Sequence, residues 1–210
     1  MARSLSGAII DGVVAAGVAD WFRLAGFTRK SRSFFRGQGV AFSTASIQAS
    51  KINMPHAATC AVNLGVEWPF LYEIWTGQQP RQNPAVAPTL AQARLDPQHG
   101  VGKDFWWPAK PGCDAEAIAK EIVDALGRFA QDFWDHYSDL DRVLNDFETG
   151  VRVPTGTRPH VVHAALLVRA GRLGDARNVL VEANRRWSHE SNSRVAERLG
   201  LEQLSSNKMA

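Results

Sequence analysis

Apolar residues near the start of the chain return every three or four positions, which is the period of an α-helix. Five residues follow this spacing: Ile10, Val14, Val18, Trp21 and Ala25. Gly26 comes directly after them, and a glycine there is typical of a helix end because it adopts positive φ at little cost. The pattern predicts an N-terminal helix with one apolar face over residues 10–25.

After this helix the pattern changes to alternation, which is typical of β-strands. The clearest case is residues 59–66, in which Cys60, Val62, Leu64 and Val66 alternate with small or polar residues. Residues 33–36 and 40–49 have the composition of strands, and the glycine-containing residues 37–39 between them predict a hairpin. Residues 90–95 and 103–107 are candidates for one or two further strands.

Two more helices are predicted before residue 150. Residues 68–77 are rich in aromatic side chains and have Pro69 near their start, which favours a short helix. Prolines at 80, 84 and 88 then predict a long irregular connection. Asp114 is a typical N-cap residue, and apolar residues at helical spacing follow it for about five turns. They are Ile118, Ile122, Leu126, Phe129 and Phe133.

The last sixty residues change character at residues 150–159, which contain glycine and proline and are predicted to be a linker. Beyond it, small and apolar residues fit two antiparallel helices joined at residues 171–174, with a further helix over 195–204. This hairpin resembles a single tetratricopeptide unit, in which small residues let two helices approach closely. The predicted organisation is a domain over 1–149, the linker, a hairpin appendage over 160–204 packed on that domain, and a flexible tail over 205–210.

These elements predict an α+β fold. A mostly antiparallel sheet of four to five strands packs against the N-terminal helix and the long helix, and an all-helical hairpin follows. The chain of 210 residues is long enough for one sizeable core and a small appendage. Its net charge of +3 hides an uneven distribution, because residues 1–95 carry +5, residues 96–148 carry −7 and residues 149–210 carry +5. Solvated helix faces are the simplest interpretation of these blocks.

Cysteine and hydrophobic content limit the class of protein. Cys60 and Cys113 lie far apart and neither belongs to a C-x-x-C pair, so free thiols are expected rather than a zinc site or a disulfide framework. No stretch approaches the roughly 20 apolar residues that cross a bilayer. Asp11 and Asp20 interrupt the apolar N-terminus, which argues against a signal peptide. We therefore expect a cytoplasmic protein with no membrane contact, no metal and no cofactor.

The usual catalytic signatures are missing from the sequence. It contains no G-x-S-x-G, no H-E-x-x-H and no phosphate-binding glycine loop. His160 and His163 have a spacing that metal ligands often show, but no third ligand lies near them in the sequence. Surface positions at the start of a helix are therefore expected for both.

The best candidate for ligand binding is a cationic cluster with no acidic residue in the interval. It consists of Arg23, Arg29, Lys30, Arg32 and Arg36. Guanidinium and ammonium groups suit the recognition of phosphate or carboxylate. Arg32 and Arg36 are separated by an even number of residues, so a regular strand places both on one face with Phe34.

A second set of candidates lies on the polar faces of the predicted strands. Thr44, Ser46 and Gln48 are two positions apart, so they share one side of their strand. Asn63 and Glu67 lie on the polar side of another strand. If these faces coincide with that of the arginines, the sheet carries a polar site, and the alternative is an ordinary solvated sheet face. A further candidate is the aromatic pair Trp106 and Trp107, of which one is expected in the core and Trp106 is the candidate for stacking on a ligand.

The order of several segments resembles one bacterial family, catalogued as domain of unknown function 4304. The resemblance rests on Ala25-Gly26-Phe27, the run from Arg29 to Arg36, Ile47-Gln48-Ala49-Ser50-Lys51, the segment from Cys60 to Val66, and Phe105-Trp106-Trp107. It covers about residues 8–147, and Asn63-Leu64-Gly65-Val66 is its most specific part. The resemblance implies a compact α+β domain with a mixed or antiparallel sheet, and it supplies no catalytic residue.

Three functions compete at this point. The first is a non-enzymatic protein-binding domain of an immunity-like or antitoxin-like kind, favoured by the missing catalytic motifs and the uneven charge. The alternative is an enzyme, or a protein that binds a small anion or nucleotide, with a site made of Arg36, Gln48, Asn63 and Glu67 and with Glu67 as the acid or base. The third is a nucleic-acid binder that uses the basic run from Arg29 to Arg36. A protein partner in the bacterial cytoplasm is the leading expectation.

Overall fold

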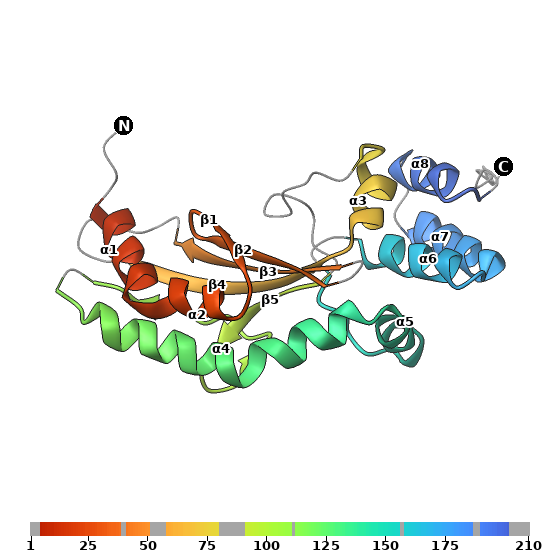
Figure 1. The fold of residues 1–210 in the computed structure, drawn as a ribbon. Coiled ribbons are helices and arrows are strands. Elements are labelled where there is room, and N and C mark those ends of the chain that lie inside the picture. Colours follow the sequence, from red (N-terminus) through yellow and green to blue (C-terminus); the bar gives the residue numbers. More distant parts are fainter. Residues whose placement is uncertain are drawn as a thin grey trace.

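The computed structural model describes residues 5–38, 41–50, 58–79, 91–110, 112–155, 158–186 and 190–201. In these residues seven strands form one sheet, and helices lie around it (Figure 1). The strands are β1 (Thr28–Lys30), β2 (Ser33–Gln38), β3 (Ala41–Ala49), β4 (Thr59–Glu67), β5 (Ala91–Asp96), β6 (Gly100–Val101) and β7 (Trp107–Pro108). The helices are α1 (Leu5–Val13), α2 (Ala19–Leu24), α3 (Pro69–Thr76), α4 (Ala115–Ser138), α5 (Leu140–Thr149), α6 (Pro159–Arg169), α7 (Leu173–Arg186) and α8 (Glu190–Arg198).

The sheet is antiparallel throughout. Its order is β1-β2-β3-β4-β5-β6, and β7 pairs separately with β4. The predicted α+β class and the predicted hairpin of β2 and β3 are therefore confirmed. The sheet has more strands than the four to five expected, because β1 and β6 contain only three and two residues and are too short to give a pattern in the sequence.

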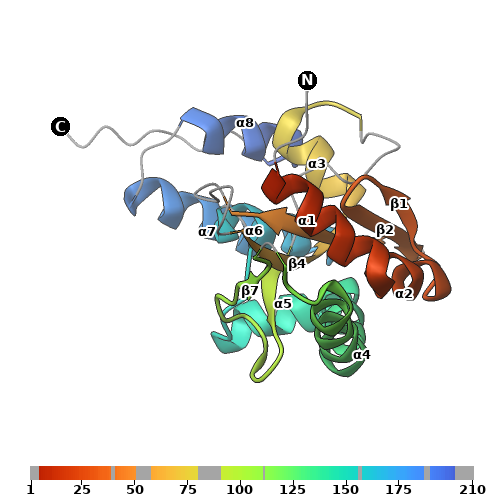
Figure 2. The ribbon, with the colours of Figure 1, turned by 90° about the vertical axis from the view of Figure 1, so that its left-hand side faces the viewer.

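The N-terminal helices and the long helix α4 cover the same face of the sheet. Phe22 of α2 stacks on Phe34 of β2 with ring centroids 4.0 Å apart. The ring centroid of Trp134 in α4 lies 4.9 Å from that of Phe27, which follows α2. A turn of π-helix over Val14–Val18 joins α1 to α2 (Figure 2). The predicted helix of residues 10–25 therefore starts earlier, at Leu5, and contains this turn.

Two aspartates cap the N-termini of the two helices in the acidic middle of the chain. The carboxylate of Asp114 accepts hydrogen bonds from the backbone N–H groups of Glu116 and Ala117, both at 3.0 Å, so the predicted N-cap of the long helix is confirmed. Asp139 caps α5 in the same way, with bonds from Asp141 and Arg142. The sequence did not predict α5 as a separate helix.

Some predicted boundaries are wrong. Residues 103–105 are not a strand, and only Trp107–Pro108 pairs with β4 in that region. Gly37 and Gln38 belong to β2 rather than to a turn. The other predicted turn residue, Gly39, lies outside the described residues, as do Val40, the prolines at 80, 84 and 88, and the tail over 205–210.

The C-terminal helices pack on the rest of the chain through a continuous core that runs from Ile10 to Leu201. Helices α6 and α7 form a hairpin around residues 170–172, and α8 lies beside α3 in both views (Figures 1 and 2). The Nη1 atom of Arg198 donates to the carbonyl oxygens of Ile74 and Trp75 at 3.0 and 2.7 Å. The likeness of this hairpin to a tetratricopeptide unit stays a prediction.

The stretch predicted as a linker also makes a sheet contact. The backbone N–H of Gln92 in β5 donates to the carbonyl of Pro154 at 2.8 Å. Residues 151–155 therefore run beside the outer edge of β5. In the part of the chain that the structure describes, no helix combines the length and the apolar character needed to span a membrane.

Candidate functional site

A row of polar side chains crosses the sheet on the face opposite to α2 and α4. The register pairs Ser46 with Asn63 and Asn63 with Arg94. The Nδ2 atom of Asn63 donates to Oε1 of Gln48 at 2.9 Å and lies 3.4 Å from Oγ of Ser46. The Nε atom of Arg94 donates to Oδ1 of Asn63 at 3.3 Å. We call Ser46, Gln48, Asn63 and Arg94 the polar strip. Because its members satisfy one another, Asn63 has little capacity left for a ligand.

Arg94 connects the polar strip to an aromatic side chain and a carboxylate. Its guanidinium carbon lies 4.3 Å from the ring centroid of Trp106, and its Nη1 atom forms an ion pair with Asp104. Trp107 is fully buried and Trp106 is partly exposed, as their alternation predicts. The candidate residue Trp106 therefore stacks on Arg94 and holds it in place.

The basic cluster predicted from the sequence does not form one surface. Arg32 donates to Oδ1 of Asp11 at 2.7 Å and to the carbonyl of Gly7 at 2.6 Å, so it ties α1 to the sheet. Arg36 donates to the carbonyl of Ala25 at 3.0 Å and to Oε1 of Gln131 at 3.1 Å, and burial lowers the pKa of its guanidinium. Both arginines share the helix-covered face with Phe34, as predicted, and both act in packing.

Two further members of the cluster lie at the sheet edge. Arg29 and Lys30 belong to β1, whose three residues are all exposed. Arg29 donates to the carbonyl of Ser31 at 2.7 Å. Arg23, the fifth member, is exposed on α2 and forms an ion pair with Asp20. The surface left for an anion is therefore smaller than the sequence suggested, because two of the five members, Arg32 and Arg36, are committed to internal contacts.

The four-residue site considered for an enzyme does not assemble. Arg36 pairs with Ser43, whose side chain is buried under the helices, whereas Gln48 and Asn63 lie on the opposite face. Glu67 shares the face of Asn63 but lies four residues along β4, outside the polar strip. Burial raises the pKa of the Glu67 carboxyl to about 8. Its Oε2 atom is buried with no hydrogen-bond partner in the described residues.

An open groove of about 890 Å³ lies at the β5 and β6 end of the sheet. We call it the edge groove. Three segments line it: residues of β5 and of the stretch 101–104, residues of α4, and residues 152–155. We call the first and the last of these the two rims and the α4 residues the floor. The lining includes Arg94, Lys103, Asp104, Phe129, Asp132, Phe133, Tyr137 and Arg152. Arg94 belongs to both the polar strip and the groove, so the strip fixes one wall of the groove.

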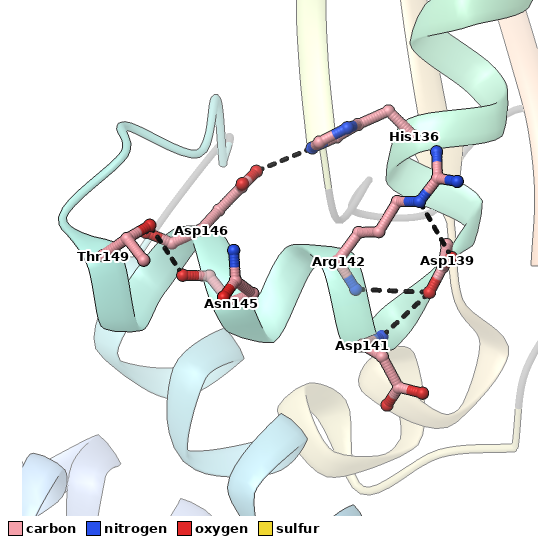
Figure 3. A network of polar contacts seen from close by, with 7 residues as sticks. All are labelled: His136, Asp139, Asp141, Arg142, Asn145, Asp146 and Thr149. Carbon is pink, nitrogen blue, oxygen red and sulfur yellow. Dashed lines mark hydrogen bonds and ion pairs between the residues drawn. The ribbon is translucent and has the colours of Figure 1, made fainter.

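An acid–base pair joins α4 to α5 beyond the end of the groove (Figure 3). The Nε2 atom of His136 lies 2.7 Å from Oδ2 of Asp146, and Asp146 is buried. Burial, together with the charge of Asp146, raises the pKa of the neighbouring Tyr137, whose ring lines the groove. Tyr137 therefore presents a neutral hydroxyl there at physiological pH.

Two of the remaining histidine and cysteine candidates are packed residues. His163 stacks on Phe147 with ring centroids 4.8 Å apart, and burial lowers its pKa, so it is not the surface residue that the sequence suggested. Cys60 is fully buried, and burial raises the pKa of its thiol to about 11. In the described ranges no three His, Cys, Asp or Glu side chains gather as a metal site would require.

Sequence reasoning missed most of the groove. Arg94 lies in a strand that was predicted, but its place beside Asn63 depends on the register of β4 and β5, which no local pattern reveals. Lys103, Asp104 and Arg152 lie in turns and connections. The one usable signal was the acidic Asp104 directly before the aromatic residues 105–107.

Fold and site together define an α+β protein with an antiparallel sheet, helices on one face and an edge groove beside α4. Residues 18–136 match the family described as "Domain of unknown function (DUF4304)". The match covers more than half of the chain, so the protein belongs to this family and the resemblance stated above is confirmed. Comparison with curated proteins and with solved structures gives no match. The family match ends before the second rim of the groove, because Arg152 lies beyond residue 136.

Proposed function

We propose that this protein is a non-enzymatic binding protein that holds a segment of another polypeptide in the edge groove. The observation that carries the proposal is the groove itself, which combines aromatic residues of α4 with charged residues on both rims. Aromatic residues and arginine are the types that contribute most at protein interfaces. The fixed position of Arg94 lowers the entropy lost when a partner binds.

The chemistry of the lining supports binding over catalysis. Among the described residues that line the groove there is no Cys, His or Ser, and the pair His136 and Asp146 lies outside it. Glu67, whose pKa suits an acid or base, is also outside the lining. A nucleophile and a base within hydrogen-bond reach are what an acyl-transfer or hydrolytic site needs.

The immunity-like or antitoxin-like kind of partner and the bacterial cytoplasm as the setting are part of the same proposal. Both rest on the sequence: the missing catalytic motifs, the two isolated cysteines and the alternating charge blocks. The nucleic-acid function is not part of the proposal, because Arg32 and Arg36 of the basic cluster bond to α1, to the C-cap of α2 and to α4.

Photocrosslinking at single positions tests the proposal. A photoreactive amino acid is placed at Gln92, an exposed residue of the groove lining, and in a second variant at Lys120, which is exposed on α4 and outside the groove lining. We expect one polypeptide of the source organism to crosslink at Gln92 and not at Lys120. Equal crosslinking at both positions, or none at Gln92, contradicts the proposal.

A further inference from the structure

The charges of the edge groove are not all available to a ligand. The ion pair of Arg94 with Asp104 neutralises both groups. Lys103 and Arg152 are exposed on opposite rims, and neither forms an ion pair or side-chain hydrogen bond with any residue that the structure describes. Within the part of the chain that the structure describes, the lining therefore offers two cations without such a contact, one on each rim.

The α4 side of the groove has a different character. Phe129 and Phe133 supply apolar surface, and Asp132 is a carboxylate with no ion pair to the described residues. A second carboxylate placed against Asp132 is repelled, whereas one placed at either rim meets Lys103 or Arg152. The lining thus separates an apolar floor from two cationic rims.

Backbone groups on the outer edge of β5 already form hydrogen bonds within the chain. The N–H of Gln92 donates to Pro154, and the carbonyl of Arg94 accepts from the N–H of Gly102, both at 2.8 Å. A partner segment therefore finds little of the β5 backbone free to pair as an added strand. Recognition in this groove has to come from side chains, which makes the rim charges the main source of selectivity.

We infer that the segment held in the edge groove is acidic, with an apolar side chain on the floor formed by Phe129 and Phe133 and carboxylates that reach Lys103 and Arg152. This inference rests on the proposed function and adds the chemistry of the partner. Arg152 lies outside the family match, so the second cationic rim is supplied by the C-terminal part of this chain.

Selection of peptides on the whole protein tests the inference. A display library of random short peptides is selected on the immobilised full chain, and each enriched peptide is compared with a version in which Asp and Glu are replaced by Asn and Gln. We expect the enriched peptides to contain carboxylates on both sides of an apolar residue. The amide versions should bind about tenfold more weakly or worse, and binding of the acidic versions should weaken as salt rises.

Variants of the protein then locate the site. Lys103→Glu and Arg152→Glu should each lower the affinity for the acidic peptides about tenfold, whereas Lys120→Glu, at an exposed lysine outside the groove, should change it by less than about twofold. Peptides without acidic enrichment whose photocrosslinks map to the groove overturn the inference and leave the proposed function standing. Failure to select any peptide that crosslinks to the groove contradicts both.

Discussion

The Nε2 atom of His136 in α4 lies 2.7 Å from the Oδ2 atom of Asp146 in α5 (Figure 3). The next residue of α5, Phe147, stacks on His163 of α6. Two adjacent residues of α5 therefore link the last helix of the family region to the first helix of the C-terminal hairpin. This link holds residues 152–155 beside β5, where they form the second rim of the edge groove.

Replacing Asp146 is predicted to weaken this link. Asp146→Ala leaves His136 without its carboxylate partner, and we expect the free energy of unfolding to fall by about 1–3 kcal/mol. Asn145→Ala, on the exposed side of the same helix, should change it by less than about 0.5 kcal/mol. Urea denaturation measures both values, and equal losses would contradict the assignment.

Glu67→Gln is predicted to remove a pH-dependent loss of stability. The pKa of Glu67 rises from its ordinary value of 4.5 to about 8 in the folded chain because the carboxyl is buried. Between these values the unfolded chain has lost a proton that the folded chain keeps, so this group lowers stability as pH rises. At pH 8 we expect the Gln variant to be more stable than the wild type by on the order of 2 kcal/mol.

The difference should shrink as pH falls and approach zero below about pH 4, where Glu67 is mostly protonated in both states. Glu73→Gln, at an exposed position on α3, is the matched control and should show no such trend. Urea denaturation across this pH range gives the comparison. Parallel stability curves for the wild type and the Glu67 variant would show that the carboxyl is not buried as described.

A methyl group at Gly77 is predicted to disturb the contact between α3 and α8. Gly77 and Gly171 have φ of +70° and +77°, so alanine is strained at both. A Cβ at Gly77 lies 2.9 Å from Cζ of Arg198, whereas a Cβ at Gly171 meets nothing within 4 Å. We therefore expect Gly77→Ala to cost about 1 kcal/mol more than Gly171→Ala in unfolding free energy.

A double-mutant cycle separates this contact from backbone strain. If the methyl group displaces Arg198 from the carbonyls of Ile74 and Trp75, Arg198→Ala costs less in the Gly77→Ala background than in the wild type. In the Gly171→Ala background its cost should be unchanged. Additive effects in both backgrounds would disprove the contact.

Arginines of the basic cluster are predicted to differ in their effect on stability. Arg36 lies over the rings of Phe27 and Trp134, at 4.7 and 5.7 Å from their centroids, and bonds to α2 and α4. Arg36→Met should therefore lower the free energy of unfolding by about 1–3 kcal/mol. Arg29→Met, at an exposed position of β1, should change it by less than about 0.5 kcal/mol. Similar values from urea denaturation would place both side chains on the surface.

Most of the fold could be predicted from the sequence because its elements carry strong local signals. The alternation in residues 59–66 and the N-cap at Asp114 both lead to the observed elements. The signal fails where an element is short, as in β6, or where a cap lies inside a charged stretch, as at Asp139. The helix α5 was missed for the second reason.

Much less of the site could be predicted. Alternation within one strand correctly placed Arg32 and Arg36 on the face of Phe34. It did not reveal that this face is opposite to that of Asn63, because the pairing of Arg36 with Ser43 depends on the register between strands. The edge groove joins three distant segments, and no local pattern specifies such a meeting.

Hydrogen–deuterium exchange on the full chain tests the central claim most directly. Exchange is compared with and without the polypeptide identified by crosslinking at Gln92. The account predicts slower exchange in residues 92–94, 101–104, 129–137 and 152–155, the segments that contain the groove lining, and no change in β1. Slower exchange confined to β1 or to the C-terminal hairpin, with the groove segments unchanged, would contradict it.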